Sequence, residues 1–141
     1  MAWPVGVRAQ SAIGQTASDL VVGAWAFVSS KVIHDNGSKS DFWGPATKGI
    51  LLFDRDGHFA QIIKRPRSGL RFAKALSIFG TYSVDSSANV ITINIDSSSV
   101  SKANGMVQHR RIISLTENEL MYMNPSIASG EKLEVLWMRF K

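Results

Sequence analysis

The sequence predicts an all-β domain, an eight-stranded up-and-down antiparallel barrel with one short helix. Short apolar segments recur along the chain at fairly even spacing and are separated by turn residues, which is typical of antiparallel β-structure. An open sheet of such strands would expose unpaired backbone groups at its edges, and closure into a barrel removes those edges. Eight strands give a barrel wide enough for a filled core or for one small ligand.

Turn signals separate the first three expected strands. The first covers residues 20–33 and ends before Asp35-Asn36-Gly37, where the Asn-Gly pair strongly favours a turn. The second covers residues 48–53. After a hairpin turn at residues 54–57, the third strand covers residues 58–64.

The short helix is expected within residues 65–77. Pro66 cannot donate a hydrogen bond to a β-ladder, so the third strand should end there. The apolar residues that follow, Leu70, Ala73 and Leu76, recur at helical spacing.

Five further strands complete the predicted barrel. The first two cover residues 79–84 and 90–95, and Ile91, Ile93 and Ile95 of the second form one apolar face. A polar loop follows this strand. The last three strands cover residues 106–115, 119–124 and 132–140.

Residues 20–141 are expected to form one domain, and residues 1–19 a flexible segment before it. A chain of 141 residues fits one domain with one core. Val7 and Ala9 stand like the small residues before a signal-peptidase cut, but the segment lacks the charged and the long apolar regions of an export signal. Two hypotheses stay open: a trimmed export signal on a periplasmic or secreted protein, or the terminus of a cytoplasmic protein.

The composition excludes several kinds of site. The sequence has no cysteine, which excludes a disulfide framework, a thiolate metal site and a cysteine nucleophile. His34, His58 and His109 do not have the spacing of metal ligands, and there is no Gly-x-Ser-x-Gly motif. We therefore expect neither a metal nor a cofactor.

The chain is basic, with a formal net charge of +5. Such a charge can favour nucleic acid, anionic lipid or an acidic small molecule, or it can serve solubility alone. One stretch is both basic and partly aromatic: Lys64, Arg65, Arg67, Arg71, Phe72 and Lys74. It has no aromatic pair or recognition-helix pattern of a nucleic-acid reader, and no apolar run approaches the ~20 residues of a spanning helix. We expect no nucleic-acid partner and no stable membrane insertion, and the oligomeric state is open.

Several motifs follow one another in a recognisable order. Gly23 and Trp25 form a Gly-x-Trp pair, and Gly44-Pro45-Ala46-Thr47-Lys48-Gly49-Ile50-Leu51-Leu52-Phe53 follows. The later motifs are Arg65-Pro66, Arg71-Phe72-Ala73, Phe79-Gly80-Thr81-Tyr82-Ser83-Val84-Asp85 and Val135-Leu136-Trp137-Met138-Arg139. Together they resemble a bacterial lipocalin-like domain family with a calycin-type β-barrel, over roughly residues 20–141. The resemblance implies the fold and only loosely a ligand class.

Three residues are expected to have structural roles at the closed end of the barrel. Gly23 allows a bend or a close approach where the first strand enters the barrel. Trp25 offers a flat face that can seal this end, and an arginine can stack on such a face. The resemblance implies that Arg139 is this arginine.

Alternation along residues 106–115 identifies candidate ligand-binding residues. Val107, His109, Arg111, Ile113 and Leu115 share one face, and the apolar members predict that this face is the interior. Arg111 would then enter the cavity, with His109 nearer its mouth. Two alternatives are open: Arg110 and Ile112 face inward instead, or Arg111 pairs with a core carboxylate.

Tyrosine hydroxyls are the other polar candidates. Tyr82 shares a face with Val84, and Tyr122 shares one with Leu120 and Asn124. A cationic group with Tyr82 and Tyr122 inside an apolar barrel could bind a carboxylate or enolate oxygen. The leading hypothesis is the binding of a small hydrophobic, potentially anionic ligand in the cavity. The alternative is an enzyme of cyclase or isomerase type, in which the same groups polarise an oxygen or move a proton.

Overall fold

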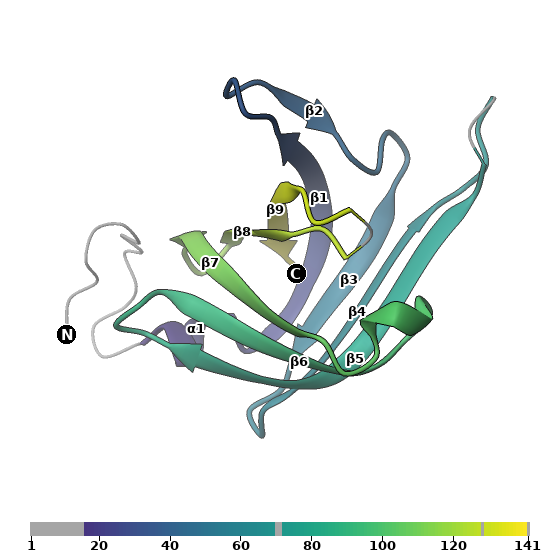
Figure 1. The fold of residues 1–141 in the computed structure, drawn as a ribbon. Coiled ribbons are helices and arrows are strands. Elements are labelled where there is room, and N and C mark those ends of the chain that lie inside the picture. Colours follow the sequence, from purple (N-terminus) through teal and green to yellow (C-terminus); the bar gives the residue numbers. More distant parts are fainter. Residues whose placement is uncertain (1–15, 70–71, 128, 141) are drawn as a thin grey trace.

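The structure is a computed structural model that describes residues 16–69, 72–127 and 129–140. Nine antiparallel strands follow the order β2-β1-β3-β4-β5-β6-β7-β8-β9, and β1 also pairs with β9. Eight strands therefore close the predicted barrel, and the short β2 lies beside the far end of β1 (Figure 1). The strands are β1 (Gly23–Ile33), β2 (Lys39–Asp41), β3 (Lys48–Phe53), β4 (His58–Arg65), β5 (Lys74–Asp85), β6 (Val90–Ser98), β7 (Val107–Leu115), β8 (Glu119–Pro125) and β9 (Lys132–Arg139).

The chain enters the barrel through a short helix, α1 (Ala17–Val21). The Thr16 hydroxyl caps it by accepting from the Asp19 N–H, and the Asp19 carboxylate accepts from the Thr16 N–H, which completes a capping box. Ala17, Leu20 and Val21 are buried in the core. The first strand thus begins at Gly23 rather than at residue 20, and residues 17–19 belong to a packed helix. The rest of the predicted flexible segment, residues 1–15, lies outside the described residues.

The helix expected within residues 65–77 is wrong. Lys74 already belongs to β5 and pairs with Arg65 of β4. Leu76 and Ile78 both point inward, so the strand alternation begins before residue 79, where the strand was expected to start. This alternation overrides the helical spacing of Ala73 and Leu76. Leu70, the first member of that pattern, lies outside the described residues. A single 3-10 turn, η1 (Ser101–Ala103), interrupts the polar loop after β6.

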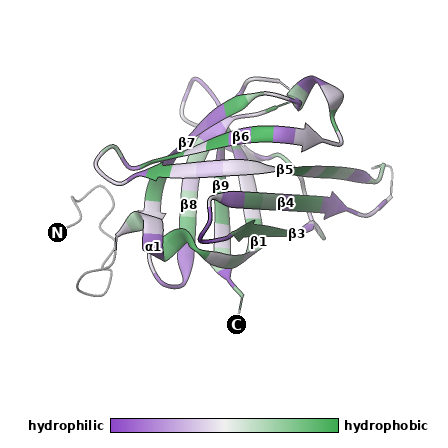
Figure 2. Cartoon of the chain, turned by 90° about the horizontal axis from the view of Figure 1, so that it is seen from below, coloured by the Kyte–Doolittle hydropathy of each residue, from purple (hydrophilic) through white to green (hydrophobic). Residues whose placement is uncertain are grey.

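Large side chains fill one half of the barrel. The largest fully buried apolar ones come from seven strands: Trp25, Leu51, Phe53, Ile78, Ile91, Ile93, Ile95, Leu115, Leu120 and Trp137. Buried and more exposed residues alternate along β4 and β6, and Figure 2 shows β3 and the middle of β4 as hydrophobic. Close packing at this end leaves room for a ligand only in the other half.

The closed end is held by Arg139 over Trp25. The guanidinium carbon lies 3.9 Å from the centre of a Trp25 ring, the contact that the sequence analysis expected. Arg139 also donates to the backbone oxygens of Leu20 and Val22, both at 2.7 Å, and so ties β9 to α1. Gly23 has a φ of 130°, and a Cβ there would lie 2.7 Å from Nη1 of Arg139. Only glycine fits this position without strain.

Candidate functional site

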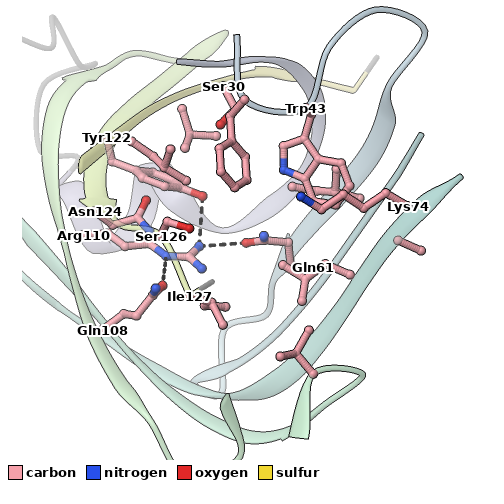
Figure 3. A pocket seen from close by; sticks show the side chains of 17 residues that line it. Ser30, Trp43, Gln61, Lys74, Gln108, Arg110, Tyr122, Asn124, Ser126 and Ile127 are labelled. Carbon is pink, nitrogen blue, oxygen red and sulfur yellow. Dashed lines mark hydrogen bonds between the residues drawn. The ribbon is translucent and has the colours of Figure 1, made fainter. Parts of the chain in front are cut away.

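A cavity of about 90 Å³ occupies the half of the barrel away from α1. Its wall is mainly apolar, and polar side chains project into it from four strands (Figure 3). They include Ser30 of β1, Gln61 of β4, Gln108 and Arg110 of β7, and Tyr122 and Asn124 of β8. This combination of an apolar wall and a few converging polar groups is typical of a small-molecule site.

Arg110 of β7 is the central polar residue of this wall. It is 2% exposed. Its Nη1 donates to Gln61 Oε1 and to the Tyr122 hydroxyl, both at 2.9 Å, and its Nε donates to Gln108 Oε1 at 3.2 Å. All three acceptors are neutral. None of the residues that line the cavity in the described chain is Asp or Glu, so no carboxylate balances this charge.

The predicted inner face of β7 is wrong. Gln108, Arg110 and Ile112 point inward, whereas His109 and Arg111 are exposed. The register shifts between Ile112 and Ser114, so Leu115 returns to the inner face after an irregularity. This bulge explains the error, because Leu115 was used to choose the face and a bulge reverses the alternation on its far side. Of the alternatives left open, the structure has the one with Arg110 inward.

His109 and Arg111 therefore lie outside the cavity. His109 Nδ1 is 3.2 Å from Thr92 Oγ1 on the neighbouring strand. Arg111 Nη2 is 3.6 Å from Met123 Sδ. Neither side chain can contact a molecule inside the barrel from this position.

Tyr122 of β8 does line the cavity, and its face is the predicted one, shared with Leu120 and Asn124. Its hydroxyl accepts hydrogen bonds from Arg110 Nη1 and from Trp137 Nε1, each at 2.9 Å. Burial raises the pKa of Tyr122, although the positive charge of Arg110 and the bond from Trp137 act in the opposite direction. The hydroxyl thus keeps its proton at neutral pH, and no described residue accepts a hydrogen bond from it.

Tyr82 of β5 lies at the other end of the barrel. Its hydroxyl donates to the backbone oxygen of Asp54 at 2.5 Å, and its ring centre is 4.6 Å from that of Phe53. It lines a separate depression beside α1, with Asp19 and Arg55 among the other lining residues. The structure does not bring it together with Tyr122.

Two polar atoms of the cavity wall are buried without a hydrogen-bond partner. They are Ser30 Oγ and Asn124 Oδ1. A buried polar atom without a partner costs free energy, about 1–3 kcal/mol in protein series. The wall thus contains an uncompensated positive charge, a hydroxyl donor and two unsatisfied oxygens, which together suit a polar group of a ligand.

Aromatic and basic side chains surround the mouth of the cavity. Lys74 Nζ lies 4.7 Å from the ring centre of Phe42 and 5.0 Å from that of Trp43. Arg65 holds this arrangement by donating to the backbone oxygens of Trp43 and Phe72. Partial burial, and secondarily the charge of Arg65, lower the pKa of Lys74. Lys74 and Arg65 make the mouth electropositive, like the interior.

Among the residues of this site, Ser30, Gln61, Lys74 and Gln108 were not predicted as ligand-binding, and Arg110 was placed inside only in an alternative. For Gln61 a signal existed, because it alternates with Phe59 and Ile63 on β4 and so had to face inward. Within the described part of the chain, no group of His, Asp and Glu residues could hold a metal ion. No helix in that part is long and apolar enough to cross a membrane.

Comparisons with known proteins agree with this architecture. A family model described as "Lipocalin-like domain" matches residues 22–139. A solved structure of a redesigned β-barrel is similar, with 13% identity, a TM-score of 0.54, and coverage of 92% of this chain and 100% of that one. A bovine odorant binding protein, solved in complex with a selenium-containing odorant, is 18% identical, with a TM-score of 0.46 and coverage of 94% and 78%. None of the curated proteins matches the chain. At these identities, the likeness to the redesigned barrel supports the fold alone.

Proposed function

Since this chain belongs to the lipocalin-like domain family, we propose that it binds a small hydrophobic ligand carrying one carboxylate. The ligand occupies the cavity with its carboxylate toward Arg110. The observation that carries the proposal is the guanidinium of Arg110, which is buried among neutral partners in a cavity without an acidic side chain.

The charge of Arg110 explains why an anion is favoured. Burying a charged group is costly unless an opposite charge or a full set of hydrogen bonds compensates it. Gln61, Gln108 and Tyr122 supply hydrogen bonds but no negative charge. A carboxylate would supply that charge, and hydrogen bonds between ionised partners are stronger than neutral ones. The unshared proton of the Tyr122 hydroxyl offers the same oxygen a second donor.

The volume of the cavity limits the size of the ligand. An enclosed cavity of ~150 Å³ holds a benzene molecule, and this cavity measures about 90 Å³. It fits a carboxylate and a few carbons, and the remaining apolar part would extend to the mouth. There Phe42, Leu76, Val100 and Ile127 provide an apolar lining. The ligand class is thus a short amphipathic acid.

Binding fits the wall better than the alternative of a cyclase or isomerase. Arg110 and Tyr122 could polarise an oxygen, but proton abstraction also needs a general base. The described lining residues include neither a histidine nor an acidic residue, and the amine of Lys74 lies over the rings of Phe42 and Trp43 at the mouth. The raised pKa of Tyr122 makes its hydroxyl a better donor than base. The groups present can hold an anion and do not complete a proton-transfer site.

A comparison of matched probes tests the proposal. Octanoate and octanol differ in charge but share the alkyl chain, and calorimetric titration measures both affinities. We expect octanoate to bind more tightly, and Arg110→Met to weaken octanoate roughly 10- to 100-fold, the scale of a charge-assisted hydrogen bond. Octanol should bind both proteins alike. Arg111→Met is the matched control, because Arg111 is exposed on the same strand. Equal affinities of the parent protein for both probes would contradict the proposal.

A further inference from the structure

The outer face of β3, β4 and β5 carries an exposed apolar band. Strand register places Ile50 opposite Ile62 and Leu52 opposite Ala60. Ala60 in turn lies opposite Phe79 of β5. Ile62 and Phe79 are 50% and 51% exposed, large fractions for apolar side chains in regular strands. We call Ile50, Leu52, Ala60, Ile62 and Phe79 the apolar band. Figure 2 shows the middle of β4 as hydrophobic between hydrophilic ends.

A basic row follows the apolar band toward the mouth of the barrel. Lys48 and Lys64 lie directly opposite each other on β3 and β4, and both are exposed. Like charges in this arrangement weaken strand pairing, so the fold gains nothing from them. Arg67 continues the row into the β4–β5 connection, where Phe72 is 77% exposed. From residue 57 to residue 84 the sequence contains no Asp or Glu.

This surface adjoins the cavity. Lys74 lines the cavity mouth and pairs with Arg65 at the end of β4. Ala75, the next residue, pairs with Lys64 of the basic row. Strands β4 and β5 run past β6 at this end, since their pairing continues to Lys74 whereas the pairing of β5 with β6 begins at Ile78 (Figure 1).

We propose that the apolar band and the basic row dock this face onto an anionic lipid bilayer. The basic row would contact the headgroups, while Phe72 and the apolar band enter the interface, as in peripheral proteins that combine basic and apolar residues. Charge complementarity argues against a second copy of the chain. Strands β3 and β4 contain no acidic residue, and the exposed Asp96 of β6, in the bulge beside Phe79, is one negative charge against the basic row. A nucleic acid would use the basic row but not the apolar band. The proposal does not depend on what the cavity binds.

Vesicle flotation tests the docking surface. The probes are vesicles of phosphatidylcholine alone and vesicles with roughly a third phosphatidylglycerol, each at low and at high salt. We expect the protein to float with the anionic vesicles at low salt and not with phosphatidylcholine. Lys64→Glu with Arg67→Glu should lower the partition coefficient by about 30-fold or more, since each basic residue near such a surface contributes about 5-fold. Ile62→Ser with Phe79→Ser should also reduce binding, without a change in charge.

A matched double variant separates this face from net charge. Arg55 and Arg111 are exposed away from the basic row, so Arg55→Glu with Arg111→Glu changes the charge equally and should leave flotation near the parent level. Circular dichroism checks that each variant is folded. Equal losses of vesicle binding in the two charge-reversal variants would overturn the proposal. It would also be overturned if the parent protein did not float with the anionic vesicles, or if an oligonucleotide displaced the protein from them.

Discussion

Arg110 donates a 2.9 Å hydrogen bond to the hydroxyl of Tyr122, which also accepts one of 2.9 Å from Trp137 Nε1. The two donors occupy the acceptor side of this hydroxyl and direct its own proton toward another acceptor. The filled half of the barrel, which contains Trp137, is thereby coupled to the cavity that contains Arg110.

Ligand-dependent stabilisation should require Arg110. A molecule that binds only the folded protein raises its melting temperature with concentration. We expect octanoate to raise the melting temperature of the parent protein and to leave that of Arg110→Met nearly unchanged. Without ligand the two proteins should differ by only about 1 kcal/mol, since relief of a buried charge offsets the lost hydrogen bonds. Thermal unfolding followed by circular dichroism measures both effects, and a full ligand response in the variant would exclude Arg110 from the site.

Removal of the Tyr122 hydroxyl should destabilise the fold itself. Tyr122→Phe leaves the buried Nε1 of Trp137 without its acceptor, and Arg110 loses one of three. An unsatisfied buried donor costs about 1–3 kcal/mol, and we expect a loss of unfolding free energy in this range. Tyr82→Phe serves as control, because its hydroxyl bond is in an exposed part of the molecule. Urea denaturation compares the variants, and equal losses would mean that the Tyr122 contact has no special weight.

The sequence predicted the inward and outward faces correctly on β8, where the alternation is unbroken. On β8, with its regular spacing, the inward placement of Tyr122 followed directly from Leu120. The pairing of Trp25 with Arg139 depended on the family resemblance, and the structure contains it. These features are local or common to many members of a fold family, so one sequence carries enough information to identify them.

The errors have two physical causes. The bulge of β7 between Ile112 and Ser114 depends on the partner strand, and no local pattern signals it. The second cause is that two periodicities overlap. The spacing of Ala73 and Leu76 fits a helix, but residues 74–85 pair with β4 and form a strand. Tertiary pairing overrode local spacing in both places, and the first error moved the predicted cation by one residue.

A methyl group at Gly23 should disturb the closed end of the barrel. Gly23 has a φ of 130°, which strains any other residue, and the added Cβ would lie 2.7 Å from Arg139 Nη1. Backbone strain of this kind costs about 1–3 kcal/mol. We therefore expect Gly23→Ala to lower the unfolding free energy by at least this amount, measured by urea denaturation. Gly37→Ala is the matched control: its φ is also positive, at 86°, but no atom lies within 4 Å of its added Cβ. Equal losses would assign the effect to φ alone and not to Arg139.

The stability of the protein at high pH should depend on Tyr122. Burial raises the pKa of its hydroxyl above the ordinary tyrosine value of 10.0. In the unfolded chain the hydroxyl ionises near pH 10, whereas in the folded protein it stays protonated to higher pH. The unfolded state therefore releases a proton first, and the unfolding free energy contributed by this group is complete below pH 10 and declines as the pH rises above it. Burial also raises the pKa of Tyr82, which is less buried than Tyr122, so Tyr82 adds a contribution of the same sign.

We expect the loss of unfolding free energy between pH 9 and pH 11 to be smaller in Tyr122→Phe than in the parent, because phenylalanine has no proton to release. Urea denaturation at the two pH values measures this slope for the parent, Tyr122→Phe and Tyr82→Phe. An unchanged slope in Tyr122→Phe would contradict this prediction, because it would mean that the Tyr122 hydroxyl has the same pKa in the folded and in the unfolded protein. The hydrogen bonds from Arg110 and Trp137 would then stabilise the phenolate enough to offset burial.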